Sequence, residues 1–468
     1  MPTRLSPADA EFYQRENTAT PMYVGSLAIL QRPRGGLSYE RLLETVERRL
    51  PQTPRYRQKV REVTLGLARP VWIDDPDFDI TYHVRRSALP SPGSDAQLHD
   101  LISRLAGRPL DRTRPLWEMY LIEGLSGNRL ALFIKSHQAL VNGLTAVEIG
   151  HVITDRDRKP AAVGDDIWLP KGEPSTGRLI LDAVTEWLAR PGQQLAAVRS
   201  TVTGVVTNSD ELTELGRRVL DTARTVVRGS APDSPLNTTV SRHRRFTVAS
   251  APLDDFRTVH TRYDCAVNDV VLAVITGALR NWLLSRGEPV ATGTAIRAMA
   301  PTSVYPDVGL PSGPGQVISE VAPFLVDLPV GEANPVIRLS QIAHAGESHS
   351  AGASLVEART IVTLSGFPPP TLHAMGTRVA TSFPARQFNL LITNVPGPQT
   401  QMYIAGAKVL QTYSLPPLLH DQVLAISVTS YCGTMYFGIN ADREAMSDVE
   451  LFGELLTEAL EELTDAAR

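Results

Sequence analysis

Residues 130–143 limit the fold of this chain more than any other stretch. The stretch begins with an apolar run, residues 130–134, that has the length and composition of a buried strand. Polar side chains follow from Lys135 to Gln138, and Asn142-Gly143 then favours a turn with positive φ. A strand that delivers polar side chains to a tight turn is a common way to build a functional site. We therefore expect chemistry at residues 135–143, which we call the motif corner.

The motif corner resembles the His-His-x-x-x-Asp-Gly signature of the bacterial wax ester synthase/diacylglycerol acyltransferase family. On that signature, His137 takes the first histidine and Gln138 the second, whereas Asn142 and Gly143 take the aspartate and the glycine. Other stretches are similar to further blocks of the family and follow in the same order. They are residues 5–10, 21–27, 72–79 with 83–84, 114–118, 267–271 and 394–398. Because these blocks cover nearly the whole chain, the sequence is identified as a member of this family.

Two positions of the motif corner depart from the family signature. The resemblance implies that the second histidine is the general base, and Gln138 stands in its place here. A glutamine side chain can orient a hydroxyl group but cannot accept its proton near neutral pH. Asn142 replaces the aspartate that orders the site, so the hydrogen-bonding capacity is kept and the charge is lost. Together the changes indicate that proton transfer at this position has been abandoned or reassigned.

The order of helical and strand-like patterns predicts an α/β fold with mixed (α+β) sheets. The resemblance implies two chloramphenicol-acetyltransferase-like halves with an active-site tunnel between them. We expect an N-terminal acyltransferase-like domain at residues 1–160, linker and crossover helices at 161–244, and a C-terminal acyltransferase-like domain at 245–468.

Several elements are predicted from hydrophobic periodicity and from turn residues. The expected helices cover residues 39–49, 97–106, 267–285, 334–349 and 448–463. The expected strands cover residues 71–73, 117–122, 130–134, 317–328, 390–393, 423–431 and 434–439. Prolines predict a loop at 299–315 and a break at 366–370.

Residues 177–228 have a helical pattern that allows two interpretations. They form either a crossover between the domains or an amphipathic segment that faces a membrane. Acidic residues at 210, 211 and 214 favour the crossover, because a membrane-binding face is usually basic.

Composition and charge narrow the class of protein. The formal net charge of −4 and the absence of a Lys/Arg block argue against nucleic acid as a partner. Cys265 and Cys432 lie far apart in the sequence, which favours a reduced, cytoplasmic location. The N-terminus lacks the apolar region of a signal peptide, and no apolar run reaches the roughly 18 residues that span a bilayer. We therefore expect a cytoplasmic protein with, at most, peripheral contact with the inner membrane or lipid inclusions.

The chemistry expected at the motif corner is acyl transfer from a thioester to an alcohol. This reaction needs a base for the hydroxyl proton, dipoles for the developing oxyanion, and a channel poor in water. His137 is the only histidine of the motif corner, but neighbouring strand residues point in opposite directions unless the backbone is distorted. Gln138 is expected to occupy the vacated base position as a hydrogen-bonding residue, and the alternative is a solvated turn residue.

Two further blocks supply residues that would support the site. Asn268 and Asp269 match a family block, although they also lie where a helix begins, and capping alone would explain one of them. Asn394, Pro396 and Gly397 belong to a turn that is expected to line the interface between the two halves.

Other chemistries find little support in the sequence. Residues 346–350 fail the G-x-S-x-G pattern at its last position, and no phosphate-binding or dinucleotide fingerprint occurs. No His, Cys and carboxylate spacing suits a metal ion. We expect no metal and no cofactor, with acyl-CoA as a substrate.

Two functional hypotheses result. The first is an O-acyltransferase that makes triacylglycerol or wax ester from acyl-CoA and diacylglycerol or a long-chain alcohol, weakened by loss of the usual histidine, with His137 or water as base. The second is a non-catalytic member that binds acyl-CoA, lipid or a partner acyltransferase. Gln138 and Asn142 favour the second hypothesis, whereas the otherwise complete set of blocks favours a retained binding tunnel under both.

Overall fold

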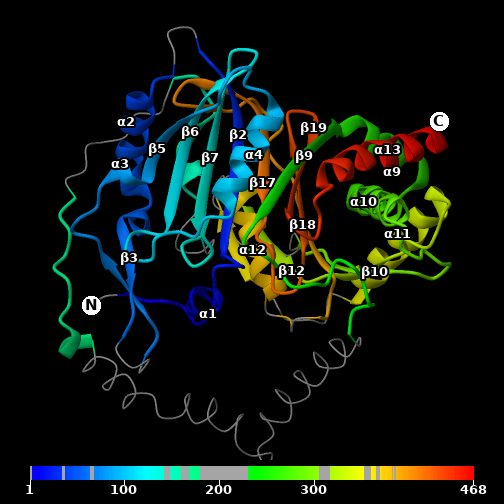
Figure 1. Ribbon diagram of the computed structural model, residues 1–468, viewed down its shortest axis with the longest axis horizontal. Coiled ribbons are helices and arrows are strands. Elements are labelled where there is room, and N and C mark those ends of the chain that lie inside the picture. The colour runs from blue at the N-terminus through cyan, green and yellow to red at the C-terminus, as the bar shows by residue number, and fades with distance from the viewer. Residues whose placement is uncertain are drawn as a thin grey trace, which may run out of the picture.

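The chain folds into two halves, each built on a sheet with helices packed against it (Figure 1). The computed structural model describes residues 3–33, 37–63, 68–141, 148–159, 168–179, 230–304, 317–352, 360–364, 369–381, 383 and 386–468. Both large sheets contain parallel and antiparallel pairs of strands. The predicted α/β class with mixed sheets is therefore confirmed.

The N-terminal half contains a seven-stranded sheet with β7 near its centre. In spatial order its strands are β5 (Val84–Ala88), β6 (Trp117–Leu125), β7 (Arg129–His137), β2 (Tyr23–Gln31), β17 (Ala407–Leu415), β16 (Tyr403–Ile404) and β8 (Thr154–Asp155). β7 runs antiparallel to both β6 and β2, and every residue of β7 after Arg129 is buried. Burial on both faces explains why its apolar run does not alternate with polar residues.

Helices and a small sheet surround this central sheet. The helices are α1 (Pro7–Arg15), α2 (Tyr39–Arg49), α3 (Ile80–His83), α4 (Asp95–Ala106) and the 3₁₀ turns η1 (Leu50–Gln52) and η2 (Pro54–Arg57). The small sheet consists of β1 (Thr3–Arg4), β4 (Val71–Asp74) and β3 (Gln58–Arg61). α4 begins two residues before the start predicted from periodicity. A capping box between Ser94 and Gln97 satisfies its first N–H groups and sets that start.

The C-terminal half contains a six-stranded sheet covered by four helices. Its strands are β13 (Leu325–Leu328), β10 (Ile296–Met299), β15 (Leu390–Val395), β18 (Leu424–Tyr431), β19 (Thr434–Asp442) and β9 (Arg244–Pro252). The helices are α9 (Leu253–Tyr263), α10 (Val267–Ser285), α11 (Pro335–Gly352) and α13 (Val449–Ala467).

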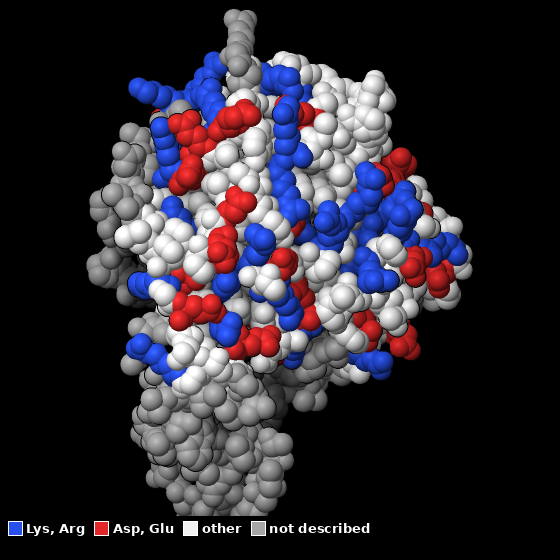
Figure 2. Space-filling view, turned by 60° about the vertical axis from the view of Figure 1, so that its left-hand side comes forward, with Lys and Arg blue, Asp and Glu red and all other residues white. Residues whose placement is uncertain are grey.

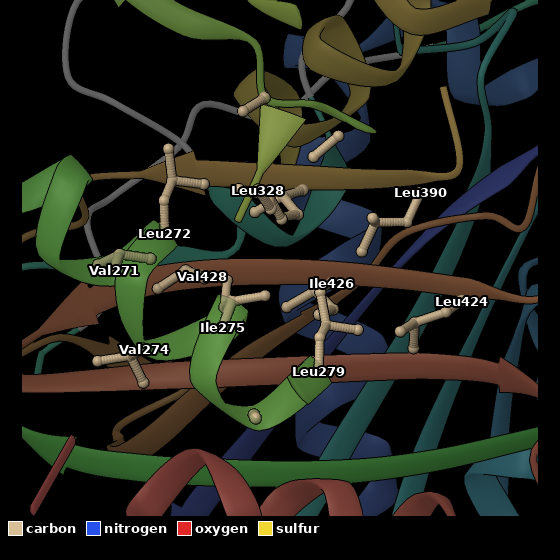
Figure 3. Packing of buried hydrophobic residues seen from close by; sticks show 14 of the residues in the cluster. Val271, Leu272, Val274, Ile275, Leu279, Leu328, Leu390, Leu424, Ile426 and Val428 are labelled. Atoms are coloured by element: carbon tan, nitrogen blue, oxygen red, sulfur yellow. The ribbon is translucent and has the colours of Figure 1, made fainter. Parts of the chain in front are cut away.

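Helix α10 forms the centre of the C-terminal core and has the bounds predicted from its apolar stripe. Figure 3 shows Ile275 and Leu279 of α10 among the side chains of Ile426 and Val428 from β18. Within the described ranges, α10 is the one helix whose length and apolar composition would suffice to cross a membrane. Of its most apolar 18-residue window, 72% is buried inside the fold, as expected for a core helix.

The predicted loop at 299–315 is wrong over its first residues. Met299 is the last residue of β10, and β11 (Thr302–Val304) pairs with β12 (Val317–Ala322). β11 lies between Pro301 and Pro306, so no proline removes a hydrogen bond from its ladder. Residues 305–316 lie outside the described part of the chain.

Two other predicted boundaries change around prolines. The single strand expected at 317–328 is two strands, β12 and β13, because Pro323 interrupts the run. Helix α12 (Pro369–Thr381) begins inside the expected break at 366–370, because proline suits the first turn of a helix. β14 (Thr360–Leu364) completes a three-stranded sheet with β11 and β12.

The two halves are joined by elements of each that pair with or pack against the sheet of the other. β17 and β16 come late in the sequence, yet β17 lies beside β2 and extends the N-terminal sheet, where Figure 1 shows it in orange. Gly25 of β2 permits this approach, because a Cβ atom there would lie 2.9 Å from the Cβ atom of Leu415. In the opposite direction, α4 packs against β9 of the C-terminal sheet. Apart from residues 177–179, the expected crossover at 177–228 lies outside the described residues.

Candidate active site

The motif corner lies where β7 ends. His137 is the last residue of β7, and its N–H donates to the Leu116 carbonyl at 3.0 Å. The Gln138 N–H donates to the Met22 carbonyl at 2.8 Å, and the His137 carbonyl accepts from the N–H groups of Leu140 and Val141. Both predicted side chains, His137 and Gln138, are fully buried, so the interpretation of Gln138 as a solvated turn residue is wrong. Asn142 and Gly143 lie outside the described residues.

Both ring nitrogens of His137 face protein groups. Nδ1 accepts a hydrogen bond from the Ala139 N–H at 2.9 Å, which leaves the proton of the neutral ring on Nε2. Nε2 in turn faces Glu16 Oε2 at 3.6 Å, and the ring of Tyr13 packs edge-on against the imidazole. This arrangement suits a histidine that supports the corner better than one that accepts a proton from a substrate.

Glu16, at the end of α1, joins several groups around His137. Its carboxylate accepts from the Met22 N–H at 3.0 Å and from Arg112 Nη2 at 3.0 Å. Burial disfavours the charged carboxylate, but the contacts with His137, Met22 and Arg112 outweigh it and lower the pKa of Glu16 to about 2. Glu16 is therefore ionised at neutral pH and holds the His137 ring in place. The sequence contained no direct signal for it beyond its position between two family blocks.

The side chain of Gln138 differs from that of His137, because it has no partner in the described part of the chain. Both Nε2 and Oε1 are buried, and neither forms a hydrogen bond with any described residue. A buried amide without partners costs about 1–3 kcal/mol, so such groups need an explanation, of which a missing polar ligand is one. The main chain of Gln138 is held from the other half of the molecule, because Arg378 of α12 donates to its carbonyl and pairs with Asp9 of α1.

A second buried carboxyl group lies close to Ser136 of the motif corner. Glu148 precedes α5 (Ile149–Val152), and its N–H donates to Thr371 Oγ1 of α12 at 3.1 Å. Burial raises the pKa of Glu148 to about 7, although the N–H groups of Gly150 and His151 and the hydroxyl of Ser136 act in the opposite direction. Glu148 can therefore gain or lose a proton near neutral pH.

A tyrosine connects the start of α5, next to Glu148, to the motif corner. Tyr56 Oη lies 3.3 Å from the Ser136 hydroxyl and accepts from the Ile149 N–H at 3.0 Å. Sequence reasoning missed Glu148, although it is the only acidic residue between 130 and 153.

The structure brings two of the predicted supporting residues together. The side-chain amide of Asn394, on β15, donates to Asn268 Oδ1, on α10, at 3.0 Å. Asp269 caps α10, because its carboxylate accepts from the Ala266 N–H at 2.9 Å. The Gly397 N–H donates to Ser430 Oγ at 3.2 Å, whereas Pro396 is exposed in the same turn. No contact between described residues joins this group directly to the side chains of His137 or Gln138.

No metal centre is evident in the described ranges. No group of three or more His, Cys, Asp or Glu side chains there could hold a metal ion. Both cysteines are free thiols, with Cys265 buried and Cys432 exposed.

Two family models match the chain in succession. The wax ester synthase/diacylglycerol acyltransferase catalytic domain matches residues 5–271, and the WS/DGAT C-terminal domain matches residues 320–464. The first match alone covers more than half of the chain and includes the motif corner.

Three relatives from Mycobacterium tuberculosis carry similar names. The probable diacylglycerol O-acyltransferases tgs1 and tgs2 are 30% and 31% identical to the chain. The tgs1 match covers 95% of this chain and 92% of the relative, and the tgs2 match covers 99% of each. The probable diacylglycerol O-acyltransferase tgs3 is 73% identical over 265 residues, which cover 57% of this chain and 98% of that protein.

Solved structures confirm the fold. The wax ester synthase/diacylglycerol acyltransferase from Marinobacter aquaeolei VT8 is 24% identical, with a TM-score of 0.67 over 99% of this chain and 100% of that chain. The first condensation domain of the CDA synthetase is 14% identical, with a TM-score of 0.53 over 100% of this chain and 97% of that chain. These likenesses agree with the two chloramphenicol-acetyltransferase-like halves that the sequence resemblance implied.

Proposed function

Because the chain belongs to the wax ester synthase/diacylglycerol acyltransferase family, we propose that it transfers a fatty acyl group from acyl-CoA to diacylglycerol or a long-chain alcohol, with weak turnover. The products would be triacylglycerol or wax ester. The observation that carries this proposal is the side-chain amide of Gln138, which is buried and has no partner among the described residues. An amide in this state suits a polar group of a substrate, either the hydroxyl of the acceptor or the carbonyl of the thioester.

The proposed turnover is weak because the motif corner lacks the usual base. Gln138 cannot accept a proton, and Nδ1 of His137 already accepts from the Ala139 N–H. Holding two reactants in a productive geometry can by itself lower a barrier by about 7–11 kcal/mol. The rate would then depend on orientation and on a proton acceptor other than Gln138. Water and Glu148 are the candidates, the latter because the pKa of Glu148 is raised to about 7.

A second candidate is a non-catalytic member that binds acyl-CoA or lipid. The specific observation in its favour is that the His137 ring faces protein groups at both nitrogens, while Gln138 has no titratable group. Such a protein would retain the polar contact at Gln138 and lose the chemical step.

We propose that neither function requires a metal or cofactor and that both take place in the cytoplasm, at the surface of a membrane or of lipid inclusions. The chemistry supports this location, because acceptor lipids partition out of water and collect at such surfaces.

The test is thioester turnover by the purified protein with acyl-CoA and either diacylglycerol or a long-chain alcohol. We expect slow ester formation by the natural protein. His137→Ala should reduce the rate only to the extent that it destabilises the fold. Glu148→Gln should abolish ester formation if Glu148 is the proton acceptor. Ester formation that disappears in a stable His137→Ala protein would make His137 the base. Acyl-CoA binding without any ester would establish the non-catalytic function instead.

A further inference from the structure

A cleft lined by six arginines lies between α4 and the start of β9. Its volume is about 820 Å³, within the range of roughly 300–1,000 Å³ that is usual for cofactor and ligand sites. α4 and the residues after it form one wall, and residues 242–246 with Arg443 form the other. We call it the arginine cleft after Arg104, Arg108, Arg242, Arg244, Arg245 and Arg443.

Within the described ranges, half of these arginines have no acidic partner. Arg104, Arg244 and Arg245 pair with Asp100, Asp442 and Glu450, respectively. Arg108, Arg242 and Arg443 are exposed in the cleft and form no ion pair with any described residue.

This excess of positive charge is unusual in a chain whose net charge is −4. Figure 2 shows charges of both signs interspersed over much of one face, with basic side chains gathered toward one side. Two acidic residues, Asp100 and Glu450, also line the cleft, so its six arginines remain in excess. Such an excess of one sign of charge raises the local concentration of ligands of the opposite sign.

Buried groups hold the wall that carries Arg242 and Arg443. Asp442 accepts from the Ser241 N–H at 2.7 Å and from the Glu444 N–H at 2.9 Å. Arg244 lies 3.8 Å from the same carboxylate, and both side chains are almost fully buried. The Arg443 N–H also donates to the His243 carbonyl at 3.1 Å. The two backbone segments that carry Arg242 and Arg443 are thereby held together before any ligand binds.

The opposite wall ends at the C-terminus of α4, where free carbonyl groups would repel an anion. Here carbonyl groups at this end accept hydrogen bonds from buried side chains. Nζ of the fully buried Lys135 donates to the carbonyls of Leu105 and Arg108, at 3.1 and 2.6 Å, and the Tyr23 hydroxyl donates to that of Ala106. The positive charge of Lys135 at this end of α4 offsets the negative end of the helix dipole.

We propose that the arginine cleft binds a small soluble ligand that carries two or more phosphate groups, of the nucleotide type. Arg108, Arg242 and Arg443 supply charge-assisted hydrogen bonds to the phosphates, because a guanidinium group matches phosphate geometry. The concave shape fits a small molecule better than a flat membrane surface. The adenosine bisphosphate portion of acyl-CoA has this chemistry, but the proposal concerns binding alone and does not depend on acyl transfer.

The test is binding of adenosine 3′,5′-bisphosphate to the full-length protein, measured by isothermal titration calorimetry. Arg242→Glu/Arg443→Glu should weaken binding by about tenfold or more, because two phosphate contacts become repulsive. Arg257→Glu/Arg262→Glu, on the exposed face of α9, makes the same charge change outside the cleft and should leave binding within about twofold. Inorganic phosphate should compete with the bisphosphate, and adenosine should not bind.

Equal affinity in the two double variants would overturn the proposal, and so would adenosine that binds as well as the bisphosphate. Cosedimentation with phosphatidylglycerol vesicles distinguishes a soluble phosphate ligand from the phosphate of a lipid headgroup. Vesicle binding that needs Arg242 and Arg443, with no binding of the bisphosphate, would make the cleft a membrane contact and contradict a soluble ligand. Because no acyl transfer is measured, absence of turnover in the enzyme assay leaves this result unaffected.

Discussion

Arg378 of α12 donates a hydrogen bond to the main-chain carbonyl of Gln138, so the C-terminal half of the molecule holds the end of β7. The same guanidinium group pairs with Asp9 of α1. One side chain therefore ties together the first helix, the motif corner and a helix that comes more than 200 residues later.

Replacing Arg378 with methionine should destabilise the protein. Removing one partner of a largely buried pair leaves the Asp9 charge uncompensated, and the expected loss in the free energy of unfolding is about 3 kcal/mol. Urea denaturation measures it. Arg15→Met is the control, because Arg15 also joins α1 to α12 but is exposed, and its loss should cost less than about 0.5 kcal/mol. Equal effects of the two substitutions would contradict the role of Arg378.

Glu16→Gln should destabilise the protein at neutral pH but not in acid. The pKa of Glu16 is lowered from its usual 4.5 to about 2, so its charge stabilises the fold above pH 4.5 and this contribution is lost as the pH falls toward 2. We expect a loss on the order of 2 kcal/mol at pH 7 that shrinks steadily below pH 4.5. Denaturation at several pH values measures the change. Glu11→Gln, on the exposed side of α1, should show little difference at any pH.

Glu148→Gln should have the opposite pH dependence. The pKa of Glu148 is raised from 4.5 to about 7, so the folded protein holds a proton that the unfolded chain releases. Stability from this group is present below pH 4.5 and is lost as the pH rises toward 7. Glutamine imitates the protonated acid, so the variant should gain up to about 3 kcal/mol over the natural protein at pH 8 and almost nothing at pH 4. Thermal melts across this range, with the exposed Glu47→Gln as control, would show whether the difference grows with pH.

Replacing Gln138 with an apolar residue should raise the stability of the protein and weaken substrate binding. Gln138→Leu removes a buried amide that has no partner among the residues the structure describes, so the free protein should become more stable by about 1 kcal/mol while substrate binding weakens. Gln422→Leu is the matched control, because Gln422 is also buried but its side chain donates to the Phe388 carbonyl, and its loss should destabilise the protein. A destabilised Gln138→Leu protein with unchanged acyl-CoA and acceptor binding would count against a ligand at this position.

Gln138→His should raise ester formation with little change in acyl-CoA affinity, because it restores a titratable group at the family's base position. An unchanged rate would indicate that the asparagine at position 142 is limiting. Adding Asn142→Asp to the Gln138→His protein tests that explanation directly, with ester formation as the measurement.

Local sequence patterns predicted the bounds of an element closely where burial of one apolar face determines its secondary structure. The apolar stripe of α10 and the polar helix α2 have the bounds that their periodicity indicated. Prediction failed where proline or tertiary pairing mattered more, as at β11, because a three-residue strand exists only through its partner β12. The crossing of β17 into the N-terminal sheet is also beyond local pattern, because strand pairing across several hundred residues leaves no periodic signal.

By itself, the sequence determined the family, the fold class and the position of the motif corner at the end of β7, because these depend on residue order and local periodicity. Only the tertiary structure decided what surrounds that corner. Glu16 and Arg378 lie far from His137 in sequence, and their contacts exist because α1 and α12 pack against the end of β7. Burial and hydrogen bonding are properties of the packed chain, so the raised pKa of Glu148, the burial of the Gln138 amide and the arginine cleft could not be predicted from residue order.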